Sequence, residues 1–590
     1  MIQNSEKLLV FTKNKRGETF SIPTKQRALV LQGGGALGAY EIGVLQSICD
    51  HYHNNIHQEG KPNDENNNHN GEQHQLFDIV AGVSIGAINA VFLIDYVLKN
   101  NGNWRNSASK LKDFWNNFKA YTFTELNPWF EATWNNYRIF NSGLARAEAA
   151  RRYWSFYQLA CLTPPFGGIS PNLCTSIYQT DTKYFSQLNN FLTYDYRPLM
   201  KLMEENIHYP IKTDFKKNQP RLLLLSVDVK DCSTSVTFDS YRSYKSKCDV
   251  CDKQLEENRL LAKHIIEHIK DLGNENIDID KSTIVKSIPT NTHSSNIDNN
   301  NDKDTSTDDQ IWISIYGDEN GENRKHVVSY NGIDNDILMT SCLFPYSNHH
   351  TSLYDLITKE KRTFWDGAFV SNTPLRELLQ KHKDFWTSYF EANEIEYDRT
   401  GEHDIDVYYN QKNERLLQTS IPKIPDLEVF IVNLYPALET QDVAIPEDKD
   451  KIEDRINDIR FHDKSIYDEK IAHLVTDYVD LTRRLIKLAK DTGKVSKNDL
   501  NEVLGIPGES TTRDVKKRRN LSSLIENKFK VKVFRIDRQD DENTVFGKAS
   551  DFTPTTLEDL YQKGLKDANE WFTNFYKVGY TKTKNTLKEE

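Results

Sequence analysis

The chain has 590 residues and a formal net charge of −11, an acidic balance that argues against a general nucleic-acid-binding protein. Hydrophobic residues make up 37% of the sequence, which is enough for a large core, and the length allows two or more domains. Seven cysteines in so long a chain do not suggest a disulfide framework, so we expect a cytoplasmic protein.

The sequence shows no pattern of a leader or a membrane span. Residues 1–20 contain one apolar run, Leu8–Thr12, which is too short for a signal peptide. The longest uncharged run, Ile79–Ile94, is shorter than a spanning helix and contains Ser84 and Asn89. We therefore expect a chain without a transmembrane segment.

A strand, a glycine-rich loop and a helix are the first predicted elements. Arg27–Gln32 has the composition of a strand, and Ala39–Ile48 has the pattern of a helix. The loop between them consists of Gly33, Gly34, Gly35, Ala36, Leu37 and Gly38. Its backbone N–H groups, placed at the start of a helix, form a site for negative charge.

Two functions fit this loop. Its glycine spacing matches the dinucleotide-binding fingerprint, which also requires an acidic residue about twenty positions later, at the end of a second strand. Asp50 lies seventeen residues after Gly33, but it ends a helical pattern. The other function is an oxyanion hole for an acyl-transfer serine, and we favour it.

A G-x-S-x-G motif follows at the next predicted strand. Phe77–Ala81 is a short apolar run typical of a buried strand, and Ile85–Leu98 is apolar at helical spacing. The motif between them consists of Gly82, Val83, Ser84, Ile85 and Gly86. A serine on a sharp turn from strand to helix is the context of a nucleophile elbow. The alternative is a glycine-rich turn with a serine that caps the helix.

An aromatic-rich block separates this motif from the next predicted strand, Arg221–Val229. It includes helical patterns at Trp104–Phe118 and Pro198–Glu205, and the aromatic run Asn127–Phe140. In acyl hydrolases such a block can line an acyl-chain pocket or cover it as a lid. Packing in the core explains the same pattern, so both interpretations stay open.

A constellation of cysteine and histidine lies at residues 248–268. Cys248, Cys251, His264 and His268 have the spacing of a two-Cys, two-His zinc site, in which thiolates and imidazoles surround the ion as a tetrahedron. The alternative is a surface helix with a coincidental set of residues, because no obvious hairpin precedes it. A structural zinc ion is therefore one of two interpretations.

The last motif is Asp366-Gly367-Ala368, reached through Thr363–Trp365. An isolated Asp-Gly pair is usually only a turn, so its value depends on the motifs before it. Beyond it the pattern predicts further helices and strands: a helix from Leu375 to about Lys383, a buried strand at Leu427–Tyr435, a long helix at Ile466–Lys490 and a strand at Lys528–Arg538.

Together these motifs resemble the patatin-like phospholipases, of bacterial or archaeal type. The glycine loop, the G-x-S-x-G motif introduced by Asp78, and Asp366-Gly367-Ala368 occur in the family's order over residues 26–378. The flanks Gly38–Glu41 and Ser371–Leu375 are also similar. One departure is Leu37, where many members carry Lys or Arg.

The resemblance implies a serine acyl hydrolase with a Ser–Asp dyad. Ser84 would attack the acyl carbonyl, Asp366 would accept its proton, and the loop Gly33–Gly38 would hold the oxyanion. An acyl-enzyme would form, and water would release the fatty acid. This chemistry needs no cofactor or metal ion, and the expected partner is a lipid or a membrane surface, with peripheral attachment to membranes. His349 and His350 leave a Ser-His-Asp triad as an alternative that the motifs do not require.

The expected fold is α/β, with a mostly parallel central sheet and helices on both faces. The hydrolase core would span residues 26–378, with disordered low-complexity insertions at 51–75 and 273–309. Residues 379–590 would form a helical C-terminal extension with added strands that packs on this core.

The predicted function is hydrolysis of lipid carboxylic esters, of phospholipase A or lysophospholipase type. Two alternatives remain: a catalytically weak lipid-binding or scaffold protein whose insertions block the site, and a dinucleotide-binding protein that uses the glycine loop. Turnover of a short-chain chromogenic ester distinguishes an enzyme from a scaffold.

Overall fold

The computed structural model describes residues 9–59, 75–120, 148, 151–152, 155, 197–229, 235–241, 247–248, 253–254, 312–316, 325–329, 332–343, 352–355, 360–399, 407–409, 415–417, 421–435, 449–491, 496, 529–538 and 547–586. Cys251, His264 and His268 lie outside these residues, as do the predicted insertion at 273–309 and the pair His349 and His350.

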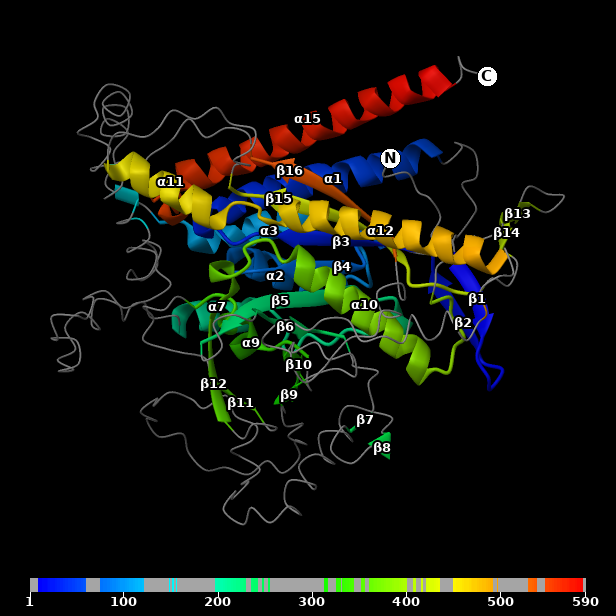
Figure 1. The fold of residues 1–590 in the computed structure, drawn as a ribbon. Helices are drawn as coiled ribbons and strands as arrows, with labels where there is room; N and C mark the ends of the chain where they lie inside the picture. The colour runs from blue at the N-terminus through cyan, green and yellow to red at the C-terminus, as the bar shows by residue number, and fades with distance from the viewer. Residues whose placement is uncertain are drawn as a thin grey trace, which may run out of the picture.

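Within the described part of the chain, one eight-stranded sheet organises the fold, in the order β11-β12-β5-β4-β3-β15-β16, with β6 also paired to β5 (Figure 1). Its strands are β3 (Lys25–Leu31), β4 (Ile79–Gly82), β5 (Arg221–Asp228), β6 (Ser235–Asp239), β11 (Ser352–Asp355), β12 (Glu360–Asp366), β15 (Asp426–Asn433) and β16 (Val531–Asp537). The five strands from β5 to β16 run parallel, whereas β6, β12 and β11 are added in antiparallel fashion. The predicted α/β fold with a mostly parallel sheet is confirmed.

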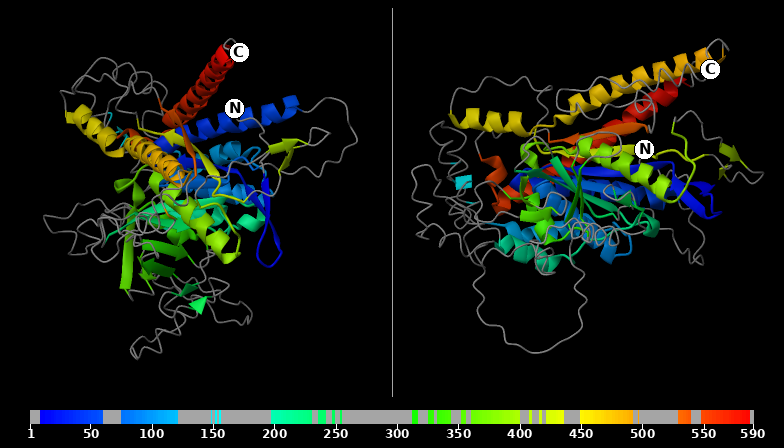
Figure 2. Two further views of the ribbon diagram at one scale, coloured as in Figure 1. Left: turned by 45° about the vertical axis from the view of Figure 1, so that its right-hand side comes forward. Right: turned by 60° about the horizontal axis from the view of Figure 1, so that its bottom comes forward.

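Helices surround this sheet. The described helices are α1 (Gly38–Glu59), α2 (Ile85–Lys99), α3 (Ser107–Trp115), α7 (Arg197–Asn206), α9 (Asn335–Thr340), α10 (Leu375–Ala392), α11 (Lys449–Phe461), α12 (Ser465–Asp491) and α15 (Pro554–Thr586). Short two-stranded sheets are formed by β1 (Leu9–Lys13) with β2 (Thr19–Pro23), β7 (Lys247–Cys248) with β8 (Lys253–Gln254), β9 (Trp312–Tyr316) with β10 (Lys325–Ser329), and β13 (Val407–Tyr409) with β14 (Arg415–Leu417). Figure 2 shows the same arrangement from two further directions.

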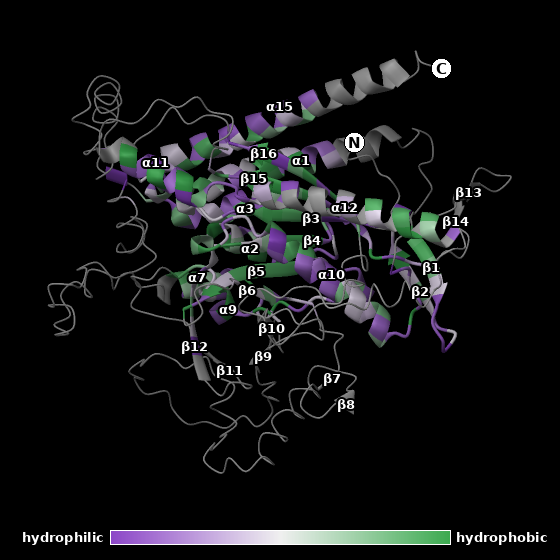
Figure 3. Ribbon diagram, in the orientation of Figure 1, coloured by the Kyte–Doolittle hydropathy of each residue, from purple (hydrophilic) through white to green (hydrophobic). Residues whose placement is uncertain are grey.

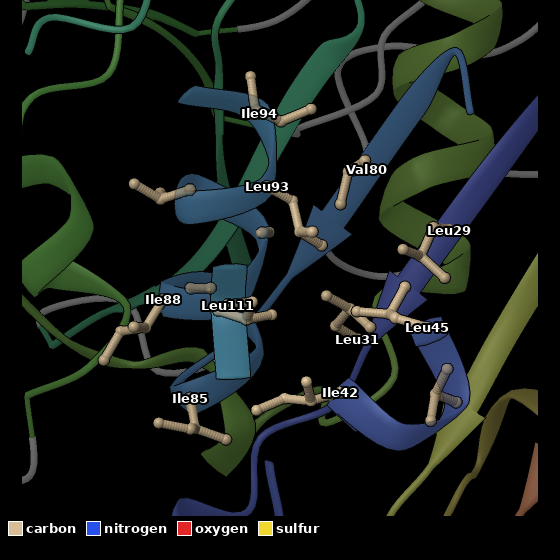
Figure 4. Close-up of a cluster of buried hydrophobic side chains, with 14 of the residues drawn as sticks. Leu29, Leu31, Ile42, Leu45, Val80, Ile85, Ile88, Leu93, Ile94 and Leu111 are labelled. Carbon is tan, nitrogen blue, oxygen red and sulfur yellow. The ribbon is translucent and has the colours of Figure 1, made fainter. Parts of the chain in front are cut away.

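The alternation of side chains along the strands divides the core between the two faces of the sheet. On one face Leu29, Leu31 and Val80 pack with apolar residues of α1, α2, α3 and α15, and Figure 4 shows part of this cluster. On the other face Ala28 and Val30 pack with residues that include the start of α10. The strands at the centre of the sheet are largely apolar where both faces are covered, as the green stretches of β3, β4 and β5 in Figure 3 show.

Helices α1 and α15 lie side by side with unusually close backbones, although they are separated by about 500 residues of sequence (Figure 1). A Cβ atom on Gly43 would collide with the carbonyl oxygen of Tyr561, and one on Gly564 with that of Tyr40. The Tyr40 hydroxyl also donates to Asp567 at 2.9 Å. Glycine is needed at both crossing points because any side chain would push the helices apart.

Two predicted boundaries differ from the structure. Helix α1 continues through Glu59, so the first nine residues of the segment 51–75 are helical, and residues 60–74 lie outside the described part of the chain. Helix α10 does not end near Lys383 but runs to Ala392, because buried Phe385, Trp386, Tyr389 and Phe390 keep a helical apolar face.

The segment assigned to a C-terminal extension supplies two strands to the central sheet. β15 pairs in parallel with β3, and β16 pairs in parallel with β15. Between these two strands in the sequence, helices α11 and α12 follow one another along the outside of the molecule (Figures 1 and 2). Among the described residues, no helix combines the length and the hydropathy that a membrane crossing requires.

Candidate active site

Ser84 lies at the turn between β4 and α2. Its backbone has φ 56° and ψ −126°, a conformation that residues with a Cβ atom rarely adopt. The turn is possible because two glycines allow close approach. A Cβ atom on Gly82 would collide with the carbonyl of Gly86, and one on Gly86 would come within 2.5 Å of the Leu31 carbonyl. The strain is concentrated at the one residue whose side chain would react.

Residues after α9 hold the backbone of this turn. The Ser84 N–H lies 3.0 Å from the carbonyl oxygen of Ser341 and 3.3 Å from its hydroxyl oxygen. The Cys342 thiol donates to the Ser84 carbonyl at 3.4 Å, and burial raises the pKa of this thiol. Sequence reasoning missed both residues, because no local pattern links them to a serine more than 250 positions earlier.

Asp366 ends strand β12 and lies beside Ser84. Strand β12 pairs with β5, and Gly367, the next residue, packs against the elbow: a Cβ atom there would come within 2.9 Å of Cγ2 of Val83. One carboxylate oxygen of Asp366, Oδ1, accepts from the N–H of Ala368 at 2.8 Å. The other, Oδ2, is buried and accepts no hydrogen bond of good geometry from the described residues.

The Asp366 carboxyl group is protonated more easily than an ordinary aspartate. Burial raises its pKa from 3.8 to about 7, while hydrogen bonding by the Ser84 hydroxyl and by the Ala368 N–H acts in the opposite direction. The Ser84 side chain is therefore close enough to stabilise the charged form. A carboxylate with a pKa near neutrality, next to a hydroxyl, is suited to accept that hydroxyl's proton.

The glycine loop runs between β3 and α1, next to the same serine. A Cβ atom on Gly33 would lie 2.9 Å from Cβ of Ser84 and 3.2 Å from Cβ of Ala368. The loop forms a short 3-10 turn, Gly35–Leu37, which leads into α1. The side chain of Leu37 is buried in the core, so this position, where the sequence departs from the pattern it resembles, is apolar and internal.

Not every N–H of the loop is available for an oxyanion. The N–H of Gly33 donates to Oδ1 of Asn372 at 2.9 Å, and the N–H of Leu37 donates to the Gly34 carbonyl at 3.1 Å. The N–H of Gly38 closes the same short turn. Among the described residues, this leaves the N–H groups of Gly34, Gly35 and Ala36 without an acceptor.

Asn372 connects the loop to the C-terminal part of the chain. Its side-chain amide accepts from Gly33 and also donates to the carbonyls of Gly33 at 3.2 Å and Phe461 at 2.8 Å. Its neighbour Thr373 accepts from the amide of Gln32 at 2.6 Å. The sequence places Asn372 in the flank of the Asp-Gly motif, but its bonding role emerges only from the tertiary structure.

A second support for the glycine loop comes from residues 547–551, in the C-terminal region of the chain. The carbonyl of Ala549 lies against Gly35, which has φ +55°, so that a Cβ atom there would collide with it. The adjacent Lys548 is buried and pairs with two carboxylates of α11, Asp454 at 3.2 Å and Asp458 at 2.8 Å. The C-terminal region, which lies outside the predicted hydrolase core, therefore contacts the glycine loop directly.

The described residues give no support to a metal centre. Cys248 belongs to the short strand β7, while its three predicted partners are among the residues that the structure does not describe. Within the described ranges, no group of three or more His, Cys, Asp or Glu side chains is arranged to hold a metal ion. The zinc site at Cys248, Cys251, His264 and His268 stays a prediction.

The dinucleotide interpretation lacks its acidic residue. Asp50 lies inside helix α1, not at the end of a second strand, whereas the strand after α1 is β4, which leads into the elbow of Ser84. A strained serine, a buried aspartate and a glycine loop at the carboxyl ends of parallel strands form a candidate site of the serine hydrolase class.

The sequence model of the family described as patatin-like phospholipase matches residues 29–379, more than half of the chain. The chain therefore belongs to this family of lipid acyl hydrolases. A comparison with curated proteins gives no match. Among solved structures, VipD from Legionella pneumophila matches with 11% sequence identity over 97% of this chain and 72% of that chain. Its TM-score is 0.23, so this likeness supports no conclusion about the site.

Proposed function

We propose that this chain hydrolyses carboxylic esters of lipids, as a phospholipase A or lysophospholipase, through a dyad of Ser84 and Asp366. One observation carries the proposal: Ser84 sits at a strained turn beside a buried aspartate whose pKa is raised to about 7. A structural serine cap would need neither the strain nor the buried carboxyl group. The cytoplasmic location expected from the composition stays a prediction.

The first half of the reaction forms an acyl-enzyme. The Ser84 hydroxyl attacks the acyl carbonyl, and its proton passes to Asp366, where Oδ2 has no competing hydrogen bond of good geometry. Negative charge then develops on the carbonyl oxygen. The N–H groups of Gly34, Gly35 and Ala36 are the donors proposed to stabilise it. Asp366 returns the proton to the leaving alcohol as the tetrahedral intermediate collapses.

The second half releases the fatty acid. A water molecule attacks the acyl-enzyme while Asp366 accepts one of its protons, and the proton then returns to Ser84. No step requires a metal ion, a cofactor or a histidine. The same buried carboxylate therefore acts as base and as acid, a role for which a pKa near neutrality is suitable.

Replacing Ser84 with Ala tests the proposal. Wild type should react with a fluorophosphonate probe and hydrolyse a short-chain chromogenic ester, and the Ser84→Ala variant should do neither while unfolding at an unchanged temperature. Ser109→Ala is a matched control, because Ser109 is an exposed serine of α3 and should remain dispensable.

The alternatives give different results in the same assays. Labelling that persists in Ser84→Ala would contradict the nucleophile assignment, and a wild type that binds lipid without turnover would be the scaffold protein. Saturable binding of NAD or FAD would instead support the dinucleotide function. A panel of lipids with mass-spectrometric identification of the products would then establish the substrate and the position of cleavage.

A further inference from the structure

A cavity of about 600 Å³ lies next to the Asp-Gly motif. One wall is the segment that follows Asp366, from Ala368 to Thr373, and continues into Arg376 at the start of α10. The opposite wall is the corner between α11 and α12, from Arg460 to Tyr467. The cavity is thus shared by the hydrolase core and the C-terminal region.

The cavity carries an excess of positive charge. Arg376, Arg460 and Lys464 line it and have exposed side chains. Neither Arg460 nor Lys464 forms an ion pair with a described carboxylate. Arg376 lies 3.1 Å from Glu377. Among the described lining residues, the one carboxylate belongs to Asp463, which is buried and already bound by Arg535 at 2.8 Å. A ligand would therefore meet cations whose charge is largely uncompensated.

The cavity adjoins the proposed catalytic groups. Ala368, which lines it, donates its N–H to Asp366, and its side chain lies against Gly33. Asn372, which also lines it, binds both the glycine loop and the Phe461 carbonyl. A molecule with its ester at Ser84 could therefore place a neighbouring group in this cavity.

We propose that this cavity binds the phosphate group of the substrate, so that the enzyme prefers phosphate-bearing lipids over uncharged acylglycerols. The proposal rests on the proposed function, because it places the ester at Ser84. In a phospholipid the phosphate is separated from the acyl esters by only the glycerol carbons and their oxygens. Arginine and lysine are the side chains that bind phosphate best, by charge-assisted hydrogen bonds.

The test removes two charges of the cavity with Arg460→Gln/Lys464→Gln. The ligands are a short-chain phosphatidic acid and the diacylglycerol with the same acyl chains, both dispersed as monomers so that attraction to a membrane surface plays no part. Because the variant loses charge-assisted hydrogen bonds to the phosphate, its KM for the phosphate-bearing lipid should rise about 10- to 100-fold. KM for the diacylglycerol and kcat for both should stay unchanged. Lys464→Glu should weaken use of the phosphate-bearing lipid as well, by repulsion.

Arg484→Gln is the matched control, since Arg484 is an exposed arginine of α12 that does not line the cavity. It should leave both KM values unchanged. Equal losses on the two lipids in the Arg460→Gln/Lys464→Gln variant, or equal KM values for them in wild type, would overturn the proposal. Inorganic phosphate and glycerol 3-phosphate identify the source of the phosphate. If glycerol 3-phosphate competes with the substrate in wild type but not in the double variant, the cavity binds a lipid headgroup. If the double variant loses binding of inorganic phosphate but keeps the lipid preference of wild type, the proposal is overturned.

Direct binding separates this proposal from the proposed function. The same lipids are titrated calorimetrically into Ser84→Ala, with and without Arg460→Gln/Lys464→Gln. Weaker binding of phosphatidic acid alone supports the cavity, even if wild type shows no turnover. Identical affinities for the two lipids reject the cavity, even if wild type proves to be an active esterase.

Discussion

At the scale of single residues, Asp366 determines how the proposed chemistry responds to pH. Its carboxyl group is buried, with a pKa raised to about 7, and it must be ionised to accept a proton from Ser84. Activity on an uncharged ester should therefore rise with pH and level off above about 7. A kcat/KM profile for a short-chain ester measures this, and a plateau that already begins near pH 4 would contradict it.

Burial of Asp366 also has a cost in stability. Because its pKa is higher in the folded than in the unfolded chain, the native state binds more protons, and stability falls as pH rises from 3.8 through about 7. The difference between these two pKa values corresponds to a loss of about 4 kcal/mol in the free energy of unfolding above neutrality. Asp366→Asn should therefore be inactive but more stable than wild type at pH 8, and this advantage should shrink at pH 4. Urea unfolding of the variant and of wild type at both pH values measures this advantage. A stability difference between the two proteins that is equal at pH 4 and pH 8 would contradict the prediction.

At the scale of elements, the glycine loop depends on contacts from both sides. Asn372 holds Gly33 from the core, and the carbonyl of Ala549 lies against Gly35 from the C-terminal region. Lys548, paired with two aspartates of α11, fixes the segment that carries Ala549. The loop is thus enclosed by elements distant in sequence, which keeps its N–H groups in one orientation.

Gly35→Ala should displace this loop. The new Cβ atom would meet the Ala549 carbonyl, and φ +55° is unfavourable for alanine by about 1–2 kcal/mol. Loss of one oxyanion donor typically lowers kcat by about 10² to 10³-fold. Gly17→Ala is the control, since Gly17 has φ +84° but open space around it, and it should cost stability without affecting kcat. An unchanged kcat in folded Gly35→Ala would mean that the loop is not the oxyanion hole.

At the scale of the whole molecule, the family region does not form a closed structure by itself. The central sheet includes β15 and β16, and α15 covers α1. The elements β15, β16 and α15 all follow residue 379. Phe552, Leu557, Leu560 and Phe572 of this C-terminal part are buried in the main core. The segment 547–586 is therefore part of the fold that positions the site.

Deletion of residues 547–590 should prevent stable folding. Each large apolar side chain contributes about 1.5–3 kcal/mol when buried. Four of them together contribute about 6–12 kcal/mol, which is as large as the 5–15 kcal/mol by which a typical domain is stable. We expect the truncated chain to aggregate or to lose cooperative unfolding in circular dichroism. Gly564→Ala, which perturbs only the crossing with α1, should lower the melting temperature less. A truncated chain with cooperative unfolding and full ester turnover would contradict this view.

The local sequence determined the features that short spacing controls. Glycines at Gly82 and Gly86 allow a sharp turn at Ser84, and alternating or helical patterns identified β15 and α12 with nearly correct ends. These features can be predicted from a single segment because they depend only on sterics and on periodic burial within that segment. They were sufficient to predict the fold class and to single out Ser84, whereas Asp366 was selected as its partner only through the resemblance to a known family.

Only the tertiary structure decided which residues support that dyad. Ser341, Asn372 and Ala549 touch Ser84 or the glycine loop from hundreds of positions away, and even for Asn372, in the flank of the Asp-Gly motif, the sequence did not predict the contact. The raised pKa of Asp366 likewise depends on burial beneath several elements, and the cationic cavity requires α10 and the α11–α12 corner to meet. Such properties arise from the summed packing of distant segments, which no local pattern encodes.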